Sequence, residues 1–386
     1  MEFVRIGIIG LGNMGSSHCI QIHIEHKVPG LKLAAVCDIS EERREWAGRE
    51  FPGVPVFEHA TDMYQSGLID AVLVAVPHYD HPSLSIEAFS HGLHVLVEKP
   101  AGVYTKQVLM MNAAAAKSDK VFCIMYNQRT NPVYQKLREL VQDGELGELK
   151  RVVWIVTDWY RPQAYHDSGS WRSTWKGEGG GTLINQNPHN LDLLQWILGM
   201  PKRLRSFVSF GKYYNIEVED DVTAYLEYAN GASGVYITST GESPGTNRLE
   251  LSGDRGKIVV ENNKITFHRN RIPEREHNRS NTEPFKRPEA WVCDIPVVGT
   301  NEDHVGIMKS FTQAILKGTP LLSPGEEGIH GLTISNAIHY STWTNDWVDL
   351  EQFNHDHFHE LLLERIQHSK VEKKLSQKVV DVTGTY

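Results

Sequence analysis

The chain has little cysteine and no long hydrophobic run. Its four cysteines, in 386 residues, are widely separated and show no Cys-x-x-Cys spacing, which excludes a disulfide-based scaffold and predicts reduced thiols. The run of about eighteen apolar residues that a membrane-spanning helix needs is missing. The first residues lead directly into a short apolar segment, without the pattern of a signal peptide. These absences predict a cytoplasmic protein that does not enter the membrane.

An excess of basic residues is also missing. Lys and Arg number 39 against 48 Asp and Glu, which gives a formal net charge of −9 at pH 7. A nucleic acid would need a clustered positive surface, so it is not an expected partner. With 40% hydrophobic and 23% charged residues, the chain can build an ordinary globular core, and its length favours two domains.

What is present at the start is an alternation of short apolar runs with helical patterns. The apolar runs are continuous, as strands buried on both faces of a parallel sheet require. Strand, helix and strand in succession predict a doubly wound α/β domain of the Rossmann type over residues 1–126. The expected strands are 4–10, 31–38, 71–76, 94–100 and 121–126, and the expected helices are 14–27, 41–50, 80–90 and 105–118.

Residues 127–386 follow a different pattern. Longer runs alternate apolar and polar residues, which predicts an α+β domain with a large, mostly antiparallel sheet that packs one face on helices. We expect a second copy of the chain to cover the other face, in a homodimer or homotetramer. The expected strands are 149–157, 203–211, 222–229, 233–240, 248–253 and 257–262, and the expected helices are 131–143, 303–317 and 325–343.

Two segments of this second half are expected to be less regular. Residues 270–300 are rich in Arg, Asn, Glu and Pro, and this composition predicts a long loop. The tail from about 352 predicts a surface helix with a mobile end. Its His355, His357 and His359 around Asp356 suggest metal ligands, but a third ligand is missing from the pattern, so a solvated helix face is favoured and no metal is expected.

A glycine-rich turn follows the first expected strand. Gly10, Gly12 and Gly15, with Asn13 and Met14 between them, form Gly-x-Gly-x-x-Gly at the start of a helix. The first glycine permits the tight turn, the second lets a pyrophosphate approach the backbone, and the third lets helix and strand pack closely. This context predicts a dinucleotide site.

The second expected strand ends on an acidic residue, Asp38. A carboxylate at this tip accepts hydrogen bonds from the adenosine ribose hydroxyls and repels a 2′-phosphate, so NAD is predicted and NADP is less favoured. Ser40, Arg43 and Arg44 nearby leave dual use open.

Two further strand tips carry polar residues. One strand ends at Pro77, followed by His78 and His81, and the next ends at Glu98 and Lys99. Ligands of open α/β sheets bind at the carboxyl ends of strands, so we expect all five residues to line the cofactor site. The Lys99 ammonium is a catalytic candidate, because it can hydrogen-bond a reacting hydroxyl and stabilise alkoxide charge.

The segment after residue 176 combines glycines with a polar stripe. Glycines 179–181 are expected to form a flexible entry to a helix on which Asn185, His189 and Asp192 share one face. A histidine held by polar neighbours is a suitable base for an alcohol proton, because its pKa lies near neutral pH. Asn185 and His189 are therefore catalytic and substrate-binding candidates.

Residues 158–175 are rich in aromatic and charged side chains. Aromatic rings that stack on a pyranose, beside groups that bond its hydroxyls, are typical of sugar sites, although such a loop also serves as a lid or subunit contact. The candidates are Trp159, Arg161, Tyr165, Asp167, Trp171, Arg172 and Trp175.

Over nearly its whole length the chain resembles the Gfo/Idh/MocA family, the group of glucose-fructose oxidoreductase and inositol dehydrogenase. The resemblance is carried by GLGNMG, AVPHYDH, EKP, YNQRTNPVYQKLRELVQDGELGEL and GGGTLINQNPHNLD. It implies that Lys99, Asn185 and His189 surround the reacting carbon, without a metal. Asn185 stands where the family usually has Asp and cannot take a proton, which leaves that role to His189 or Lys99, and we favour His189. His78 stands where Asn is common.

These features predict an NAD-dependent oxidoreductase that reversibly oxidises a secondary hydroxyl of a sugar, glycoside or inositol to a ketone. Two alternatives stay open. One is a glycoside hydrolase that retains NAD and works through transient oxidation and elimination. The other is a sugar or dinucleotide sensor without catalysis, which Asn185 favours and the retained Lys99 and His189 disfavour.

Overall fold

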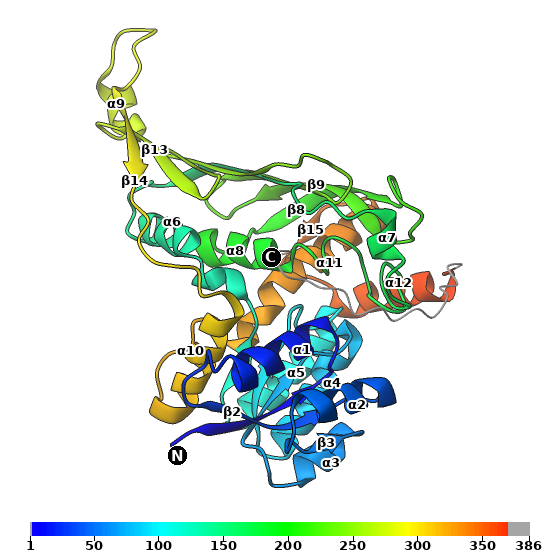
Figure 1. The fold of residues 1–386 in the computed structure, drawn as a ribbon. Coiled ribbons are helices and arrows are strands. Elements are labelled where there is room, and N and C mark those ends of the chain that lie inside the picture. Colours follow the sequence, from blue (N-terminus) through cyan, green and yellow to red (C-terminus); the bar gives the residue numbers. More distant parts are fainter. Residues whose placement is uncertain (1, 370–386) are drawn as a thin grey trace.

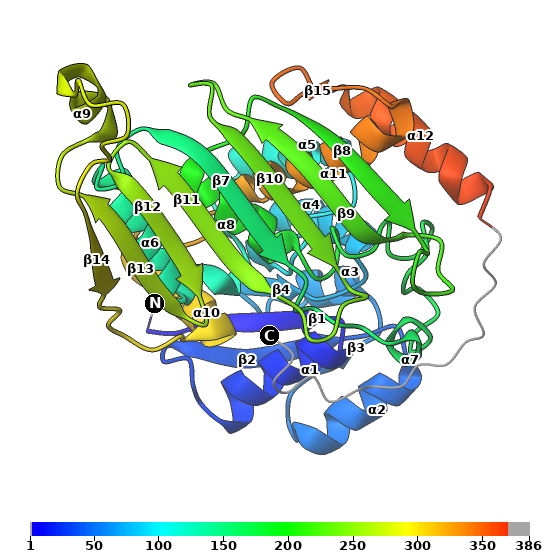
Figure 2. The ribbon, with the colours of Figure 1, turned by 90° about the horizontal axis from the view of Figure 1, so that it is seen from above.

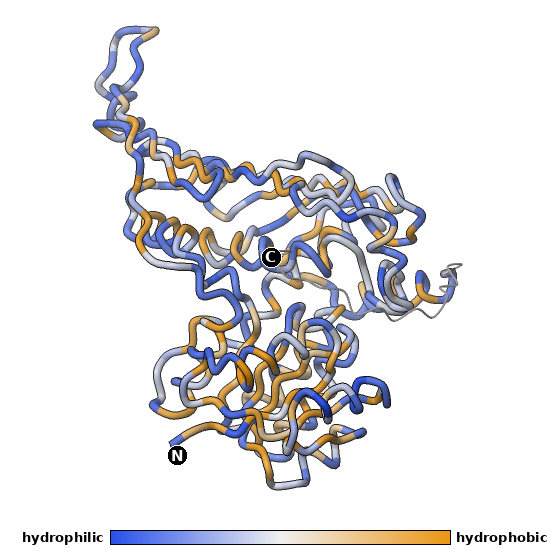
Figure 3. Tube along the Cα trace, viewed as in Figure 1, coloured by the Kyte–Doolittle hydropathy of each residue, from blue (hydrophilic) through white to orange (hydrophobic). Residues whose placement is uncertain are grey.

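The computed structural model describes residues 2–369, so the expected mobile end of the tail lies outside the described residues. Two sheets lie one above the other, each with its own helices (Figure 1). The interior of the first domain is the most continuously apolar part of the trace (Figure 3). Within residues 2–369 no helix is both long and apolar enough to span a bilayer.

The first sheet is parallel, with strand order β3-β2-β1-β4-β5-β6, as the continuous apolar runs predicted. The short β3 and α3 were not expected, because a two-residue strand leaves no apolar run to detect. The expected first helix ends early and continues as a π-helical turn, Ile20–Ile24. The elements are β1 (Val4–Ile9), α1 (Asn13–Cys19), β2 (Leu31–Cys37), α2 (Glu41–Glu50), β3 (Val56–Phe57), α3 (Ala60–Gln65), β4 (Ala71–Val74), α4 (His81–Ser90), β5 (His94–Val97), α5 (Thr105–Ala116) and β6 (Phe122–Ile124).

One layer of this first core comes from the far end of the chain. Helix α10 (Asp303–Lys317) brings Ile307, Met308 and Phe311 into the same buried cluster as the side chains of β1. Residues 1–126 therefore supply the whole sheet but not the whole core around it.

The second sheet has nine strands in the order β14-β13-β12-β11-β7-β10-β9-β8-β15. All neighbours are antiparallel except β7 and β10, which are parallel at the centre. The elements are α6 (Pro132–Gln142), β7 (Leu149–Val156), α7 (Gln163–His166), α8 (Pro188–Leu198), β8 (Arg203–Phe210), β9 (Glu219–Glu227), β10 (Ser233–Ser239), β11 (Asn247–Gly253), β12 (Gly256–Glu261), β13 (Lys264–Asn270), α9 (Glu274–Ser280), β14 (Ala290–Ile295), α11 (Gly328–Thr344), β15 (Val348–Asp349) and α12 (His355–Gln367).

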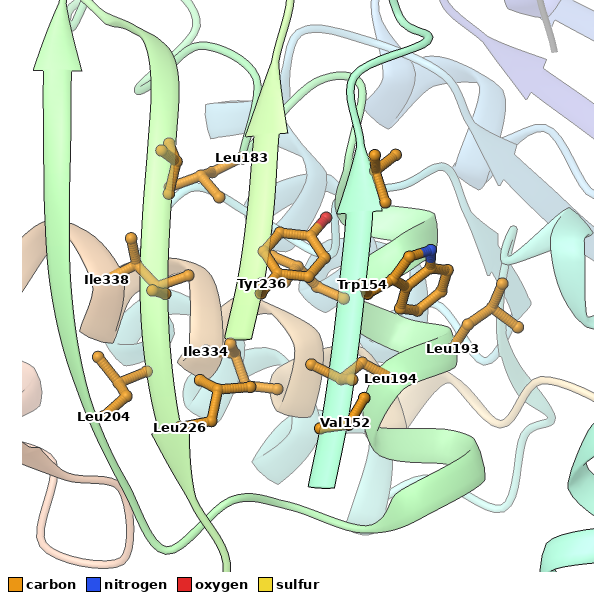
Figure 4. Close-up of a cluster of buried hydrophobic side chains, with 14 of the residues drawn as sticks. Val152, Trp154, Leu183, Leu193, Leu194, Leu204, Leu226, Tyr236, Ile334 and Ile338 are labelled. Atoms are coloured by element: carbon orange, nitrogen blue, oxygen red, sulfur yellow. The ribbon is translucent and has the colours of Figure 1, made fainter. Parts of the chain in front are cut away.

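One face of this sheet packs on helices and the other does not. The alternating buried residues of the strands meet α8 and α11, and their shared cluster includes Trp154, Leu194, Leu226, Tyr236 and Ile338 (Figure 4). No described element lies over the opposite face, which Figure 2 shows from above.

The expectation of a long loop over 270–300 is wrong. The segment forms α9 and β14, and β14 pairs with β13, a strand that was also not expected. These elements project from the body of the molecule (Figure 1). Because the residues of β14 are mostly exposed, the strand lacks the apolar alternation from which strands are recognised.

Candidate active site

The turn between β1 and α1 has the shape that a bound dinucleotide requires. Gly10 has φ +88°, and a Cβ on Gly15 would lie 1.8 Å from the Gly10 carbonyl oxygen. A Cβ on Gly12 would meet no atom within 4 Å, and no side chain caps the helix there. The two outer glycines are thus needed by the fold itself, whereas Gly12 leaves open space at a helix N-terminus, where a pyrophosphate fits.

Asp38 lies beside this turn and holds it. Its carboxylate accepts hydrogen bonds from the backbone N–H of Leu11 at 2.6 Å and of Ser40 at 2.8 Å. Arg43 donates to the Leu11 carbonyl oxygen at 2.7 Å. The acidic group that the sequence assigned to the ribose is therefore at the glycine turn, where a dinucleotide site places it.

The tip of β5 carries an ion pair and the lysine. Glu98 Oε1 lies 2.7 Å from His18 Nε2, and both side chains are buried. Burial raises the pKa of Glu98, but the hydrogen bond and charge of His18 outweigh it and lower the pKa to about 2. Lys99 Nζ donates to the Asn185 carbonyl oxygen at 3.0 Å. Burial lowers the pKa of Lys99, and the Glu98 carboxylate partly offsets this effect.

The tip of β4 joins the two domains. Pro77 is exposed, whereas His78 is buried against the second domain, with Nδ1 3.2 Å from the Glu178 carbonyl oxygen. Both ring nitrogens of His81 lie at backbone carbonyl oxygens, those of Pro100 and Val76, at 2.7 and 2.8 Å. His81 thus ties the β4 and β5 tips together.

Asn185 does not lie on the helix, contrary to the expectation. It belongs to a turn that precedes α8, and its Nδ2 donates to Oε1 of Glu178. The glycines before it are not a flexible entry either: a Cβ on Gly181 would lie 2.1 Å from the Glu219 carbonyl oxygen. Close packing therefore holds Asn185 between Lys99 and Glu178.

His189 lies in the first turn of α8 and is 3% exposed, and neither ring nitrogen has a hydrogen-bond partner among residues 2–369. Burial, together with the charges of Lys99 and His304, lowers its pKa to about 3. A buried polar ring without a partner is costly, and a ligand hydroxyl would relieve this cost. The neutral imidazole is also the form that can accept a proton.

Asp192, which follows His189 on α8, is occupied by an ion pair. Its two carboxylate oxygens accept from Nε and Nη2 of Arg129, at 2.8 and 2.7 Å, and both side chains are buried. Arg129 also contacts Glu327 at 2.6 Å. This bidentate pair connects α8 to the segment after β6 and has no free group for a ligand.

The aromatic segment contributes a compact group rather than a continuous platform. Tyr165 Oη accepts from Arg172 at 2.8 Å and from Gln186 at 3.1 Å, and the Arg172 guanidinium lies 4.7 Å from the ring centres of both Tyr165 and Trp171. Trp171 in turn packs on His78, with ring centroids 5.4 Å apart. This group therefore lies next to the β4 tip.

Of the other members of the predicted sugar pool, Arg161 contacts this group, Asp167 is exposed and Trp175 is buried. The Arg161 guanidinium packs between Trp159 and Tyr165, and Asp167 is exposed and bonds Gln163. Trp175 is 5% exposed and packs on Trp343 and other aromatic rings. Trp175 is thus part of the core beneath the site.

The histidines of α12 do not converge. His355 bonds Thr105, His357 bonds Tyr340, and His359 stacks on Tyr104. Among residues 2–369 no group of three or more His, Cys, Asp or Glu is placed to hold a metal ion.

Sequence reasoning missed two residues of the site. Glu178 is buried beside Asn185, and its signal was an acid directly before three glycines. His18 completes the Glu98 pair, and its signal was a histidine three residues after the glycine motif. His18 and Glu98 are 80 residues apart in sequence, and Glu178 meets Asn185 through a turn rather than a regular helix spacing, so no local pattern joined either pair.

Comparison with known proteins identifies the family of both domains. Residues 4–126 match the oxidoreductase family with an NAD-binding Rossmann fold, and residues 134–259 match the GFO/IDH/MocA C-terminal domain. Rhizopine catabolism protein MocA of Rhizobium meliloti is 29% identical over 249 residues, which are 64% of this chain and 74% of that protein. Levoglucosan dehydrogenase of Pseudarthrobacter phenanthrenivorans is 23% identical, over 92% of this chain and 100% of that protein.

A solved structure shows the same fold. The WlbA dehydrogenase of Bordetella pertussis, in complex with NADH and UDP-GlcNAcA, superposes with a TM-score of 0.76 at 24% identity, over 90% of this chain and 98% of that one. The fold, the glycine turn and the matched domains define an NAD-binding oxidoreductase. The chain belongs to the Gfo/Idh/MocA family, so the resemblance found in the sequence is confirmed.

Proposed function

We propose that this protein reversibly oxidises a secondary hydroxyl of a sugar, glycoside or inositol to a ketone. The observation that supports this most is that Lys99, in the domain that carries the glycine turn, bonds Asn185 and lies near enough to His189 for its charge to lower the pKa of that ring. Bound NAD supplies the chemistry of hydride acceptance at nicotinamide C4. The names of the relatives, among them inositol 2-dehydrogenase and levoglucosan dehydrogenase, support the substrate class.

Lys99 and His189 have different roles in this reaction: Lys99 stabilises charge, and His189 accepts the proton. The Lys99 ammonium hydrogen-bonds the reacting oxygen and stabilises the negative charge that develops on it. His189, neutral because its pKa is lowered to about 3, accepts the hydroxyl proton at a ring nitrogen. As the substrate oxygen becomes anionic beside this buried ring, the pKa of His189 rises, because an opposite charge favours the imidazolium.

In the cofactor site, we assign Gly10, Gly12 and Gly15, with Asn13 and Met14, to the pyrophosphate, and Asp38 to the adenosine ribose. Pro77, His78, Glu98 and Lys99 lie at the strand tips that face the nicotinamide half, and His81 supports them. The substrate contacts come from Tyr165, Trp171 and Arg172, since these side chains adjoin His78, with Trp159, Arg161 and Asp167 around them.

The test is the absorbance of NADH when the purified protein is mixed with NAD and a panel of inositols, free pyranoses and glycosides. Lys99→Ala is the control variant. A signal that disappears in Lys99→Ala supports the proposal. Cofactor binding without any signal across the panel contradicts it and favours the cofactor-retaining hydrolase or the sensor.

We also propose that the open face of the second sheet is a subunit interface between two copies of this chain. Apolar side chains share its centre: Val153 is opposite Val235, and Ile155 is opposite Ile237. Phe207 on β8 is 67% exposed and pairs with Thr223, the residue that also pairs with Ile237, so it extends this apolar surface, and contiguous exposed apolar patches mark interaction sites. Analytical ultracentrifugation should give a dimer or tetramer that Val235→Lys dissociates. A monomeric wild-type protein at micromolar concentration would contradict the proposal.

We place the protein in the cytoplasm. Cys19, Cys37, Cys123 and Cys293 are all free thiols, and the first three are buried, which suits a reducing compartment. Cell fractionation with a tagged chain tests this assignment.

A further inference from the structure

Glu178 is a buried carboxyl that the proposed hydride transfer does not use. Glu178 is 2% exposed and directly precedes glycines 179–181, which lead to Asn185. A carboxylate in such a position is destabilising unless polar groups satisfy it. Glu178 Oε2 accepts the backbone N–H of Ser173 at 2.5 Å, and Oε1 accepts Nδ2 of Asn185.

The bond to Glu178 determines which way the Asn185 amide faces. A carboxylate oxygen accepts hydrogen bonds and cannot donate them, so the NH2 group of Asn185 must point toward Glu178. The Oδ1 atom, on the other branch of the same planar amide, must then point away from it. Among residues 2–369 no hydrogen bond to Asn185 Oδ1 is formed.

Asn185 is fixed at its backbone as well as at its side chain. Its carbonyl oxygen accepts the Lys99 ammonium at 3.0 Å. One residue therefore joins Lys99, at the tip of β5, to Glu178. Burial raises the pKa of the Glu178 carboxyl, and the Arg172 guanidinium and the hydrogen bonds from Ser173 and Asn185 partly offset this effect.

We infer that Glu178 is a positioning residue that orients the Asn185 amide so that its Oδ1 accepts a hydrogen bond from a hydroxyl of the substrate. The inference rests on the proposed function, because it assigns a contact within that same substrate site. It also restricts the substrate: the group at Asn185 must be a donor, so a hydroxyl is accepted there, whereas a methoxy group in its place is rejected.

The test is a swap of the two side chains. In Glu178→Gln the partner of Asn185 can donate as well as accept, so the amide is no longer held in one orientation. Loss of a hydrogen bond to a charged group predicts a fall in kcat/KM of roughly 10- to 100-fold. Asn185→Asp places two carboxylates together and should be impaired at least as much.

The double variant Glu178→Gln with Asn185→Asp restores one acceptor and one donor at the same two places. In this double variant the carboxylate at position 185 presents one oxygen to the substrate, and the amide at position 178 donates to the other oxygen of that carboxylate. The double variant should therefore recover most of the kcat/KM that either single variant loses. A merely structural role of Glu178 gives additive losses, and additive losses would overturn the inference. Unchanged kcat/KM in Glu178→Gln would overturn it too.

The matched control is Glu217→Gln. Glu217 also accepts a backbone N–H in this region, that of Trp175 at 2.8 Å, but it does not touch Asn185. This variant removes one negative charge from the same region and should keep the kcat/KM of the wild type. A loss equal to that of Glu178→Gln would show a general charge effect and contradict the positioning role.

A second measurement separates this inference from the proposed function. Asn-selective 15N labelling, with the Asn185 side-chain signal assigned by its absence in Asn185→Asp, reports the hydrogen bond without any turnover. Its NH2 protons should exchange slowly with solvent and should exchange faster in Glu178→Gln. If the amide protons exchange slowly but the protein oxidises no sugar, the amide orientation is supported and only the proposed function is wrong. Equal exchange in both proteins overturns the inference itself.

Discussion

His18 Nε2 and Glu98 Oε1 lie 2.7 Å apart in the interior of the first domain, one from the helix after the glycine turn and the other from the tip of β5. This pair joins the half of the site that holds the pyrophosphate to the half that holds the lysine. Because Glu98 directly precedes Lys99, the pair also fixes the position from which the lysine side chain begins.

Without the Glu98 charge, the free energy of unfolding should depend less on pH in the acidic range. The carboxyl has an ordinary pKa of 4.5 when unfolded and about 2 when folded. Its contribution is therefore present above pH 4.5 and is lost as the pH falls toward 2. Glu98→Gln should lower the free energy of unfolding at pH 7 by about 3 kcal/mol, with a smaller difference near pH 3.

Urea unfolding at several pH values measures this difference. Glu45→Gln is the control, since Glu45 is 65% exposed and pairs only loosely with Arg49 at 3.8 Å, and such surface pairs add little to stability. A difference between Glu98→Gln and wild type that does not shrink on acidification would contradict the ion-pair account.

Gly12 and Gly15 should respond oppositely to a methyl group. Gly12→Ala meets no protein atom within 4 Å, so the melting temperature should be unchanged while the Kd for NADH rises roughly tenfold or more, since the methyl occupies the pyrophosphate position. Gly15→Ala would place Cβ 1.8 Å from the Gly10 carbonyl oxygen and should lower the melting temperature without any ligand. Scanning calorimetry and NADH fluorescence titration measure both. Normal NADH affinity in Gly12→Ala would refute the assigned pyrophosphate site.

Lys99 should produce an alkaline limb in the pH profile. Its pKa is lowered from the ordinary 10.5 by burial, so the cation needed for the alkoxide is lost at a pH below 10.5, and kcat/KM of the oxidation should fall there. Lys99→Arg keeps the charge and should move this limb to higher pH. Steady-state kinetics with a saturating cofactor measures it, and an alkaline limb at the same pH in both proteins would assign it to another group.

His189 concerns the acidic side of the pH profile of kcat/KM. Because its pKa is lowered to about 3, the imidazole is already neutral at pH 5, and no limb near 6.5 is expected. His189→Gln should lower kcat by roughly 100-fold or more, since proton transfer contributes about that much. A wild-type limb near the ordinary histidine pKa that disappears in His189→Gln would contradict the lowered pKa, because the pH profile of kcat/KM reports the free enzyme.

Asp38 should control the choice between NAD and NADP. Asp38→Ser removes the charge that repels a 2′-phosphate, near the guanidinium groups of Arg43 and Arg44. The ratio of NADPH to NADH affinity should rise roughly tenfold. Asp62→Ser, an exposed acid on α3, is the matched control. A ratio that stays the same in Asp38→Ser would mean that the carboxylate acts only on the Leu11 and Ser40 backbone.

The first domain could be predicted from sequence because its signals are local. Continuous apolar runs located β1, β2, β4, β5 and β6, and the glycine motif with Asp38 located the turn. The second domain was less predictable where its strands lack an apolar face, as in β14. The parallel pairing of β7 with β10 has no local signal, because it depends on the return of the chain from the edge of the sheet.

The site shows the same division. Lys99 and His189 stand out in short motifs, and the structure brings both to one place. Asp192 has the helical spacing of a site residue, yet Arg129, far away in sequence, pairs with it. Spacing cannot reveal such a partner. Glu178 was missed although Asn185 is only seven residues away, because the turn that brings them together has no regular spacing.

The origin of α10 has a consequence for synthesis of the chain on the ribosome. Strand β6 ends at Ile124, but α10, whose Ile307, Met308 and Phe311 complete the first core, begins only at Asp303. At a synthesis rate of about 5–20 residues per second, roughly 10 to 35 seconds pass between β6 and α10, and during this time an apolar face of the first sheet is exposed to solvent. A nascent chain stalled between these two points is therefore a natural client for chaperones, and a nucleotide-binding fragment made for the laboratory must carry α10 with it.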